Sequence, residues 1–207
     1  MLVNKINFIQ NLAFKGRSET TPKIMPRLEK DIFIRSYENN LPIINETTQI
    51  PMHHEVNGWN NTIRDALEEE GKSRRADKID KEFEKLPPLE KDIIVYRGRT
   101  ESFVKRFNRD FKIIENAKIG DIVTPDTAYS YTALNRDLAE RFTSTYEDIK
   151  SMIYEIKIPK GAKVSRNMEH GGEVLMPRGA KYRLLSKEID SRGVLIVKME
   201  YILPENN

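Results

Sequence analysis

The stretch Gly171-Gly172-Glu173-Val174-Leu175-Met176-Pro177-Arg178-Gly179 places a carboxylate between two glycines and a short apolar run. Glycines let the backbone turn tightly, and the apolar run is typical of a strand that ends at its proline. We therefore expect Glu173 to stand at the beginning of a strand, held by that strand and reached from a loop. The same pattern also describes an ordinary exposed glutamate, so other stretches must decide between the two interpretations.

Length and composition indicate a soluble globular chain with one large domain, or one domain with a helical extension. Of its 207 residues, 38% are hydrophobic and 32% are charged, and no apolar run approaches the roughly 18 residues that would span a membrane. Cysteine is absent, which excludes disulfides, thiol nucleophiles and cysteine-bound zinc. Polar residues interrupt the first sixteen positions, so we expect a cytoplasmic protein without a secretory signal. The net charge of +3 does not by itself establish nucleic-acid binding.

The first half of the chain is patterned as helices. Apolar residues recur at helical spacing over residues 2–14 and 28–39, with a loop at 16–27 between them, whereas residues 40–58 show no clear period and are expected to be irregular. Two clearer helices follow, each with one apolar face: Trp59, Ile63, Ala66 and Leu67 in the first, and Ala76, Ile79, Phe83 and Leu86 in the second. Pro87-Pro88 stops the second helix. We expect an N-terminal helical lobe over residues 1–92, which either stands alone or forms part of one domain.

After residue 92 the pattern changes to strands. The apolar run at 93–96 is typical of a buried strand, and residues 119–124 and 129–134 also suit strands. Apolar residues alternate with charged ones over 154–158 and 197–201, as in half-buried strands. Short helices are expected over 101–110 and after the capping residue Asn135, with Leu138, Ala139 and Phe142 facing inward. The sequence thus predicts an α+β protein with a β-rich core over residues 93–207.

The triplet His53-His54-Glu55 is the one stretch that suggests a metal site. Helical metal sites place their ligands three or four residues apart and need further ligands elsewhere, whereas adjacent histidines point in different directions. Only His170 remains in the chain, so we expect no metal. The sequence also carries neither of the glycine-rich motifs that cradle phosphates.

Arg97 follows the apolar run directly and precedes Gly98. A guanidinium held at the end of a buried strand suits a diphosphate or a carboxylate, and a glycine lets a ligand approach the backbone closely. The stretch Tyr129–Asn135 offers hydroxyls that orient a catalytic group and aromatic rings that stack on a flat ligand. A structural ion pair for Arg97, and β propensity alone for Tyr129–Asn135, are equally ordinary interpretations.

Taken in order, these three stretches resemble the R-S-E class of mono-ADP-ribosyltransferases. Tyr96-Arg97-Gly98 is similar to the first motif of that class, whose arginine binds NAD. Leu134-Asn135, with Ala139 and Phe142, is similar to the end of the second motif, the Ser-Thr-Ser strand. Gly172–Pro177 resembles the third, the strand of the catalytic glutamate, and Ile158–Ala162 resembles its usual lead-in. The resemblance covers about residues 93–202. In length and in its pattern of expected helices and strands, the chain is most similar to the bacteriophage Mod and Alt type, in particular the ModB branch.

The resemblance implies an ADP-ribosyltransferase-like β-sandwich core behind the helical lobe, and transfer of ADP-ribose from NAD, its substrate, without a metal. It assigns Glu173 to the catalysis and Arg97, beside Gly98, to the diphosphate. Tyr129 or Tyr131 would stack on nicotinamide, and Thr132 with Ser130 would orient the glutamate. Anchored on Leu134-Asn135, the Ser-Thr-Ser register falls on Tyr131-Thr132-Ala133, and a shift by one residue begins it at Ser130.

The implied acceptor is a side chain, arginine first, of host proteins of transcription or translation. Arginine-specific members carry a second glutamate two residues before the catalytic one, where this chain has Gly171, and Glu169 is the nearest substitute. If the adenosine end of NAD faces solvent, an NAD-capped RNA could also serve as donor, because basic residues favour its phosphates. Two alternatives stay open: a hydrolase of NAD, and a non-enzymatic adaptor that binds RNA or ribosomal proteins. The sequence does not indicate an oligomeric state.

Overall fold

The computed structural model describes residues 46–104, 108–144, 149–167 and 172–204. The helices and loop expected before residue 40 lie outside these residues, as do Glu169 and Gly171. The described helices are α3 (Glu46–Glu70), α4 (Arg74–Glu84), α5 (Arg109–Asn116) and α6 (Arg136–Glu140). The described strands are β1 (Ile93–Thr100), β2 (Ile122–Val123), β3 (Ser130–Ala133), β4 (Ser151–Ile158), β5 (Ser165–Asn167), β6 (Glu173–Met176), β7 (Tyr182–Ile189) and β8 (Leu195–Tyr201).

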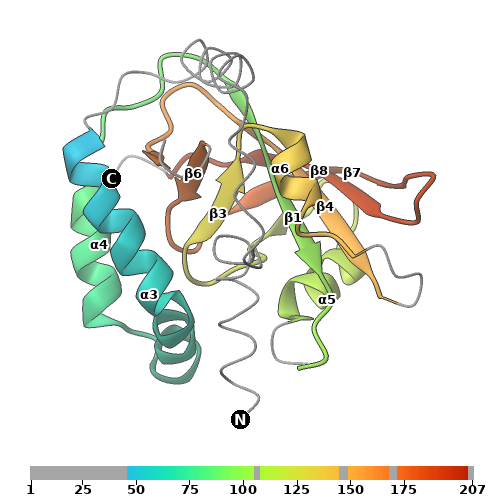
Figure 1. Cartoon of the computed structure of the whole chain (residues 1–207), viewed down its shortest axis with the longest axis horizontal. Helices are drawn as coiled ribbons and strands as arrows, with labels where there is room; N and C mark the ends of the chain where they lie inside the picture. Colours follow the sequence, from blue (N-terminus) through green and yellow to red (C-terminus); the bar gives the residue numbers. More distant parts are fainter. Residues whose placement is uncertain (1–45, 105–107, 145–148, 168–171, 205–207) are drawn as a thin grey trace, which may run out of the picture. The chain divides into compact units, whose positions relative to one another are not determined.

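The strands form one eight-stranded sheet in the order β2-β7-β8-β4-β1-β3-β6-β5 (Figure 1). Its neighbours pair antiparallel, except for the parallel pair β4 and β8. β1 and β4 pair along their whole length, whereas β1 and β3 share the single pair Tyr96 and Ala133. The sheet therefore has two halves joined at a narrow junction between β1 and β3.

The main core lies between these two halves. Val174 and Met176 of β6 pack in the same buried cluster as Val197 and Met199 of β8, although β6 and β8 are separated in the sheet order. One half must therefore fold over the other, because side chains of a flat sheet could not meet in this way. The α+β class and the two-layered β core expected from the sequence are confirmed.

A second core forms where α3 and α4 cover the other face of β3 and β6, on the left in Figure 1. Met52, Val56 and Ile63 of α3 and Phe83 of α4 pack there with Leu175 of the sheet. The expected apolar face of α4 is confirmed, with Ser73 as its N-cap. These helices belong to one compact unit with the strands, which covers residues 37–207. No described helix is long and apolar enough to cross a membrane.

Two expectations for the helices were wrong. Residues 46–58, expected to be irregular, form the first half of α3, because Met52 and Val56 supply one buried face despite the neighbouring proline. Trp59 does not face inward: it is 42% exposed, and the Arg75 guanidinium lies 3.9 Å above its ring.

The helix expected over 101–110 is wrong in position, since α5 begins at Arg109. The side chain of Asn108 closes the preceding loop through hydrogen bonds with both backbone groups of Ser102, each 2.7 Å long. Asn135 caps α6 as expected, accepting a hydrogen bond from the backbone of Asp137, and Ala139 is buried. Phe142, in contrast, is 37% exposed.

Candidate active site

Glu173 is the first residue of β6, as the sequence predicts. Gly172 before it has φ of 83°, a conformation that glycine adopts without strain, and the strand ends directly before Pro177. The side chain of Glu173 is 13% exposed, and its carboxylate lies 3.9 Å from the Nδ1 atom of His53. A carboxylate that is largely buried yet reachable from a loop is suited to act on a bound ligand.

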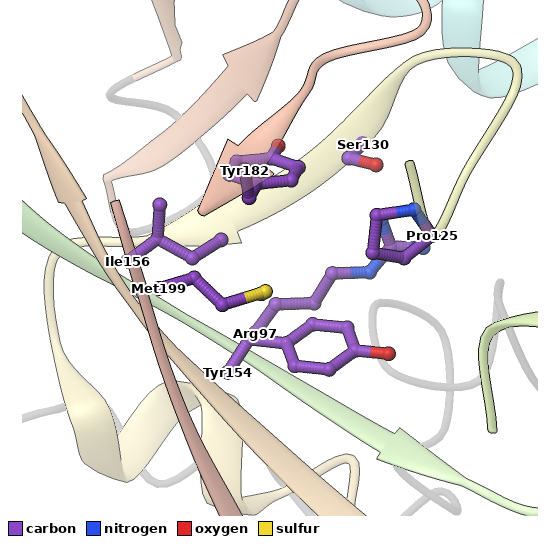
Figure 2. Close-up of a pocket in the computed structure, with 7 residues that line it drawn as sticks. All are labelled: Arg97, Pro125, Ser130, Tyr154, Ile156, Tyr182 and Met199. Atoms are coloured by element: carbon purple, nitrogen blue, oxygen red, sulfur yellow. The ribbon is translucent and has the colours of Figure 1, made fainter. Parts of the chain in front are cut away.

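Arg97 occupies the fifth position of β1 and not its end, because β4 continues to pair with β1 as far as Thr100. Its side chain is 17% exposed and one terminal nitrogen lies 3.2 Å from a carboxylate oxygen of Asp126. Figure 2 shows the guanidinium beside Pro125, with Tyr154 and Ser130 around the same small cavity. Among the described residues no further hydrogen bond engages the Arg97 guanidinium, so its other N–H groups are suited to an anion.

Asp126 is held by a second arginine, Arg64 of α3. Two nitrogens of Arg64 contact the two carboxylate oxygens at 3.0 and 3.1 Å, and the backbone N–H of Ala128 donates a further hydrogen bond. Burial alone would raise the pKa of Asp126, but the two guanidinium groups hold it well below its usual value. Arg64, Asp126 and Arg97 therefore form a cluster with a net charge of +1.

Neither Arg64 nor Asp126 was predicted as a site residue from the sequence. The sequence feature that could have identified Arg64 is its spacing from His53 and Asn60. These residues are seven and four positions apart, which places them on one side of a helix. Asn60 exchanges two hydrogen bonds with the backbone of Tyr129, at 2.9 and 3.2 Å. α3 therefore contacts the sheet beside Glu173, at Tyr129 and beside Arg97.

The hydroxyls of Ser130 and Thr132 lie on the opposite face of the sheet from Glu173. Cross-strand partners share a face and neighbours along a strand alternate, so Glu173 shares its face with its partner Ala133 and with Tyr131. Thr132 donates a 2.8 Å hydrogen bond to the carbonyl of Val174. Among the described residues no hydrogen bond joins either hydroxyl to Glu173, so the predicted orienting role does not fit this geometry.

The two candidate tyrosines occupy different environments. Tyr129 is fully buried, and its ring stacks on Phe83 at 5.7 Å between centroids. Its hydroxyl lies within donating distance of the Asp80 carboxylate, at 2.5 Å, and of the Ala76 carbonyl, at 2.9 Å. A ring covered in this way is a core residue and not a platform for nicotinamide. Tyr131 is partly exposed on the face of Glu173, and burial together with the charge of Glu173 raises the pKa of its hydroxyl.

Gly98 has a structural reason to be glycine. A Cβ atom at this position would lie 1.8 Å from the backbone oxygen of Ala139, because α6 packs directly on β1. The close approach expected at Gly98 is thus made by a helix of the same chain. Of the first two histidines, His53 is buried and His54 is exposed, so they point in different directions. In the part of the chain that the structure describes, no three His, Cys, Asp or Glu side chains gather as metal ligands do.

The strand register relates Glu173 to β1. Tyr96 pairs with Ala133, and Ala133 pairs with Glu173, so these residues form one row across β1, β3 and β6. With about 4.8 Å between strands, the backbone of Glu173 lies roughly 10 Å from that of Tyr96. The side chain of Arg97, next to Tyr96, falls on the other face of the sheet, with Ser130 at the same small cavity. The cationic cluster of Arg97 and Arg64 is suited to a diphosphate, and the carboxylate of Glu173 is suited to a developing positive charge.

The chain belongs to the ADP-ribosyltransferase exoenzyme family, whose model matches residues 51–203. It is therefore a mono-ADP-ribosyltransferase that uses NAD as its substrate, which confirms the transferase activity and the substrate expected from the sequence. The R-S-E class, the specificity for arginine and the placement within the bacteriophage Mod and Alt type stay predictions.

Solved structures show the same fold. The ADP-ribosyltransferase Vis of Vibrio splendidus, in complex with agmatine, is 18% identical with a TM-score of 0.54, and the match covers 93% of this chain and 90% of Vis. Plx2a of Paenibacillus larvae is 19% identical with a TM-score of 0.56, over 84% and 97% of the two chains. The C3 exoenzyme of Clostridium limosum is 16% identical with a TM-score of 0.55, over 87% and 96%. A comparison with curated proteins found no match.

Proposed function

We propose that this enzyme transfers ADP-ribose from NAD to an arginine side chain of host proteins of transcription or translation, in the cytoplasm of a bacterium infected by a phage. The observation that carries the chemistry is the position of Glu173, fixed and largely buried at the start of β6, in a row that reaches β1 at Tyr96, the residue before Arg97. In this proposal Arg97 and Arg64 hold the diphosphate and Glu173 faces the ribose next to nicotinamide.

In the proposed reaction, the bond between C1′ of the ribose and the nicotinamide nitrogen breaks, and its electron pair leaves with nicotinamide. The sugar becomes oxocarbenium-like, as in glycoside hydrolysis. The charge of Glu173 stabilises the positive charge where it develops. A guanidinium nitrogen of the acceptor then forms the new bond to C1′ and gives up one proton. The leaving group carries its own positive charge in NAD, so its departure requires no proton.

Arginine as acceptor is supported by the resemblance to the R-S-E class and by the structure of Vis, which contains agmatine, a small guanidine. Gly171 stands where arginine-specific members carry a glutamate, and we assign acceptor activation to Glu169. Mass spectrometry of a labelled acceptor tests this directly, because ADP-ribose on aspartate, asparagine or cysteine would contradict it.

We further propose NAD-capped RNA as an alternative donor, supported by the surplus of basic residues, 35 against 32 acidic ones. Covalent attachment of an NAD-capped oligonucleotide to an acceptor protein is the expected result. Attachment that requires the NAD cap and disappears in Glu173→Gln would support the proposal. An oligonucleotide that stays free under conditions in which NAD labels the same acceptor would refute it.

The central experiment mixes the purified enzyme with labelled NAD and a bacterial lysate, beside the variant Glu173→Gln. Label on discrete protein bands with the wild type alone is the expected result. Gln keeps the shape but removes the charge, so we expect a loss of roughly 10²- to 10³-fold, the cost of removing one preorganised electrostatic group. Nicotinamide release without labelled protein would identify an NAD hydrolase. Neither label nor release, with no effect of Glu173→Gln on binding of RNA or ribosomal proteins, would identify an adaptor.

A further inference from the structure

His53 is a buried polar residue beside the catalytic carboxylate, and the reaction described above gives it no part. It lies on α3, outside the three motifs, and is 2% exposed. Its Nε2 atom lies 2.9 Å from the hydroxyl oxygen of Ser165 on β5, and its Nδ1 atom lies 3.9 Å from Oε2 of Glu173. Among the described residues Nδ1 has no hydrogen-bond partner. A buried nitrogen without a partner costs free energy, and in a folded protein such a nitrogen is a candidate for a functional role.

Glu173 needs a group that fixes its position, since a carboxylate stabilises a developing charge only if it is already in place. The hydroxyls of Ser130 and Thr132 lie on the other face of the sheet, and Thr132 bonds the carbonyl of Val174. The corresponding positions on the face of Glu173 are Tyr131 and Ala133. The hydroxyl of Tyr131 donates to the backbone oxygen of His53 at 2.8 Å, so it holds His53 and not the carboxylate.

We propose that His53 is the positioning residue of Glu173, donating from Nδ1 to the carboxylate and thereby holding it against the ribose of NAD. This inference rests on the proposed function of Glu173. The ligand-free separation exceeds a normal hydrogen bond by about 1 Å, a gap that a small rotation of the carboxylate closes. Because an ionised carboxylate only accepts, the lone pair of an unprotonated Nδ1 would repel it, and the tautomer with hydrogen on Nδ1 is required. Nε2 then accepts from Ser165.

The surroundings make His53 a rigid support. Hydrogen bonds attach its helix to β3 and to the segment before it at three levels: Tyr131 to the carbonyl of His53, Asn60 to the backbone of Tyr129, and Arg64 to Asp126. The ring of His53 also contacts that of Tyr131 edge-on, at 5.8 Å between centroids. A side chain fixed in this way can hold a catalytic group within the tolerance that catalysis demands.

Two substitutions distinguish the role of Nδ1 from that of Nε2 in the imidazole of His53. In His53→Asn the amide nitrogen takes the place of Nδ1, which keeps a donor toward Glu173 and loses the contact with Ser165. In His53→Gln the amide lies near the place of Nε2, which keeps Ser165 and loses the donor. His54→Gln, on the exposed neighbour, is the matched control. Nicotinamide release from NAD is measured with each protein, and thermal unfolding shows that each is folded.

We expect His53→Gln to lower kcat by up to about 10²-fold, the effect of displacing a catalytic group by roughly 1 Å, with little change in KM for NAD. His53→Asn should recover most of that loss, and His54→Gln should equal the wild type. In a Glu173→Gln background, His53→Gln should add almost nothing, because the group it positions is gone. Equal losses in His53→Asn and His53→Gln, or full additivity with Glu173→Gln, would overturn the proposal.

A readout without turnover separates this proposal from the proposed function. The ¹⁵N NMR spectrum of the imidazole distinguishes the two neutral tautomers, and we expect His53 to carry its hydrogen on Nδ1 in the wild type. An Nδ1 atom that carries no hydrogen would refute the positioning role even in an active enzyme. A wild type that releases no nicotinamide and labels no protein, but shows hydrogen on Nδ1, would instead refute the proposed function and leave the contact in place.

Discussion

Arg64 of α3 holds both carboxylate oxygens of Asp126 through nitrogens at 3.0 and 3.1 Å, and so connects this helix to the segment between β2 and β3. Asp126 in turn contacts Arg97 at 3.2 Å, so one carboxylate pairs with two guanidinium groups. An anion that binds here meets a preformed pair of arginines whose positions depend on Asp126.

Asp126→Asn is expected to destabilise the fold. It leaves two largely buried guanidinium groups without their carboxylate, and removing one partner of a buried ion pair costs about 3–5 kcal/mol. Denaturant unfolding at neutral pH measures the loss. Addition of a diphosphate such as ADP should raise the stability of the variant more than that of the wild type, because the anion replaces the missing charge. An equal gain in both proteins would contradict the placement of the diphosphate.

Because the pKa of Asp126 is lowered in the folded state, the free energy of unfolding should depend on pH. The pKa of Asp126 is lowered in the folded state, so its contribution is present above the unfolded-state pKa of about 3.9 and is lost as the pH falls toward the lower, folded-state value. The difference in unfolding free energy between the wild type and Asp126→Asn should therefore be largest near neutral pH and shrink below about pH 4. A difference that is constant between pH 7 and pH 3 would show that the carboxylate is not the group responsible.

Arg97→Lys keeps a positive charge near Asp126 but loses the planar fork that matches a diphosphate. Hydrogen bonds to charged groups contribute about 1.5–3 kcal/mol, so the KM for NAD should rise roughly ten- to a hundredfold. The kcat should change less, because the carboxylate at C1′ is unaffected. Steady-state kinetics measure both constants. Arg192→Lys, at an exposed ion pair with Glu140, is the control and should leave both unchanged.

Gly98→Ala is expected to destabilise the protein through the contact with α6. The added methyl would meet the Ala139 oxygen at 1.8 Å, and overpacking of this kind costs about 1–3 kcal/mol or more. At roughly 2–4 °C per kcal/mol, thermal unfolding should show a clear decrease in Tm. Gly58→Ala, within α3 and with no atom within 4 Å of the added methyl, should instead stabilise the helix by about 0.5–1 kcal/mol. If Gly98→Ala keeps its Tm but loses NAD binding, Gly98 serves the ligand after all.

Tyr129→Phe distinguishes a core tyrosine from one in the active site. The lost hydroxyl removes the hydrogen bonding to the Asp80 carboxylate and the Ala76 carbonyl, which should lower the unfolding free energy by about 1.5–3 kcal/mol. Below the unfolding temperature, kcat and KM should equal those of the wild type. Tyr131→Phe, which frees the carbonyl of His53, should lower kcat without a comparable change in KM. Altered kinetics in Tyr129→Phe would show that its side chain reaches the ligand.

The sequence by itself determined the local features of this protein. The glycine, the apolar run and the proline around Glu173 sufficed to predict the beginning and end of β6, because turn and strand preferences act within a few residues. The cap at Asn135 and the apolar face of α4 were predictable for the same reason. The order of the three motifs then indicated the family.

The tertiary structure alone decided which side chains meet. Residues 46–58 are helical because Met52 and Val56 are buried against the sheet. The residue pattern around the proline did not indicate this burial. Asp126 lies 62 residues from Arg64 and 29 from Arg97, and Glu173 lies far along the chain from His53. Local sequence preferences do not determine which residues that far apart in the chain come into contact. These contacts follow from the strand register and from the face on which each side chain falls, and a shift by one residue would have exchanged the faces of Thr132 and Tyr131.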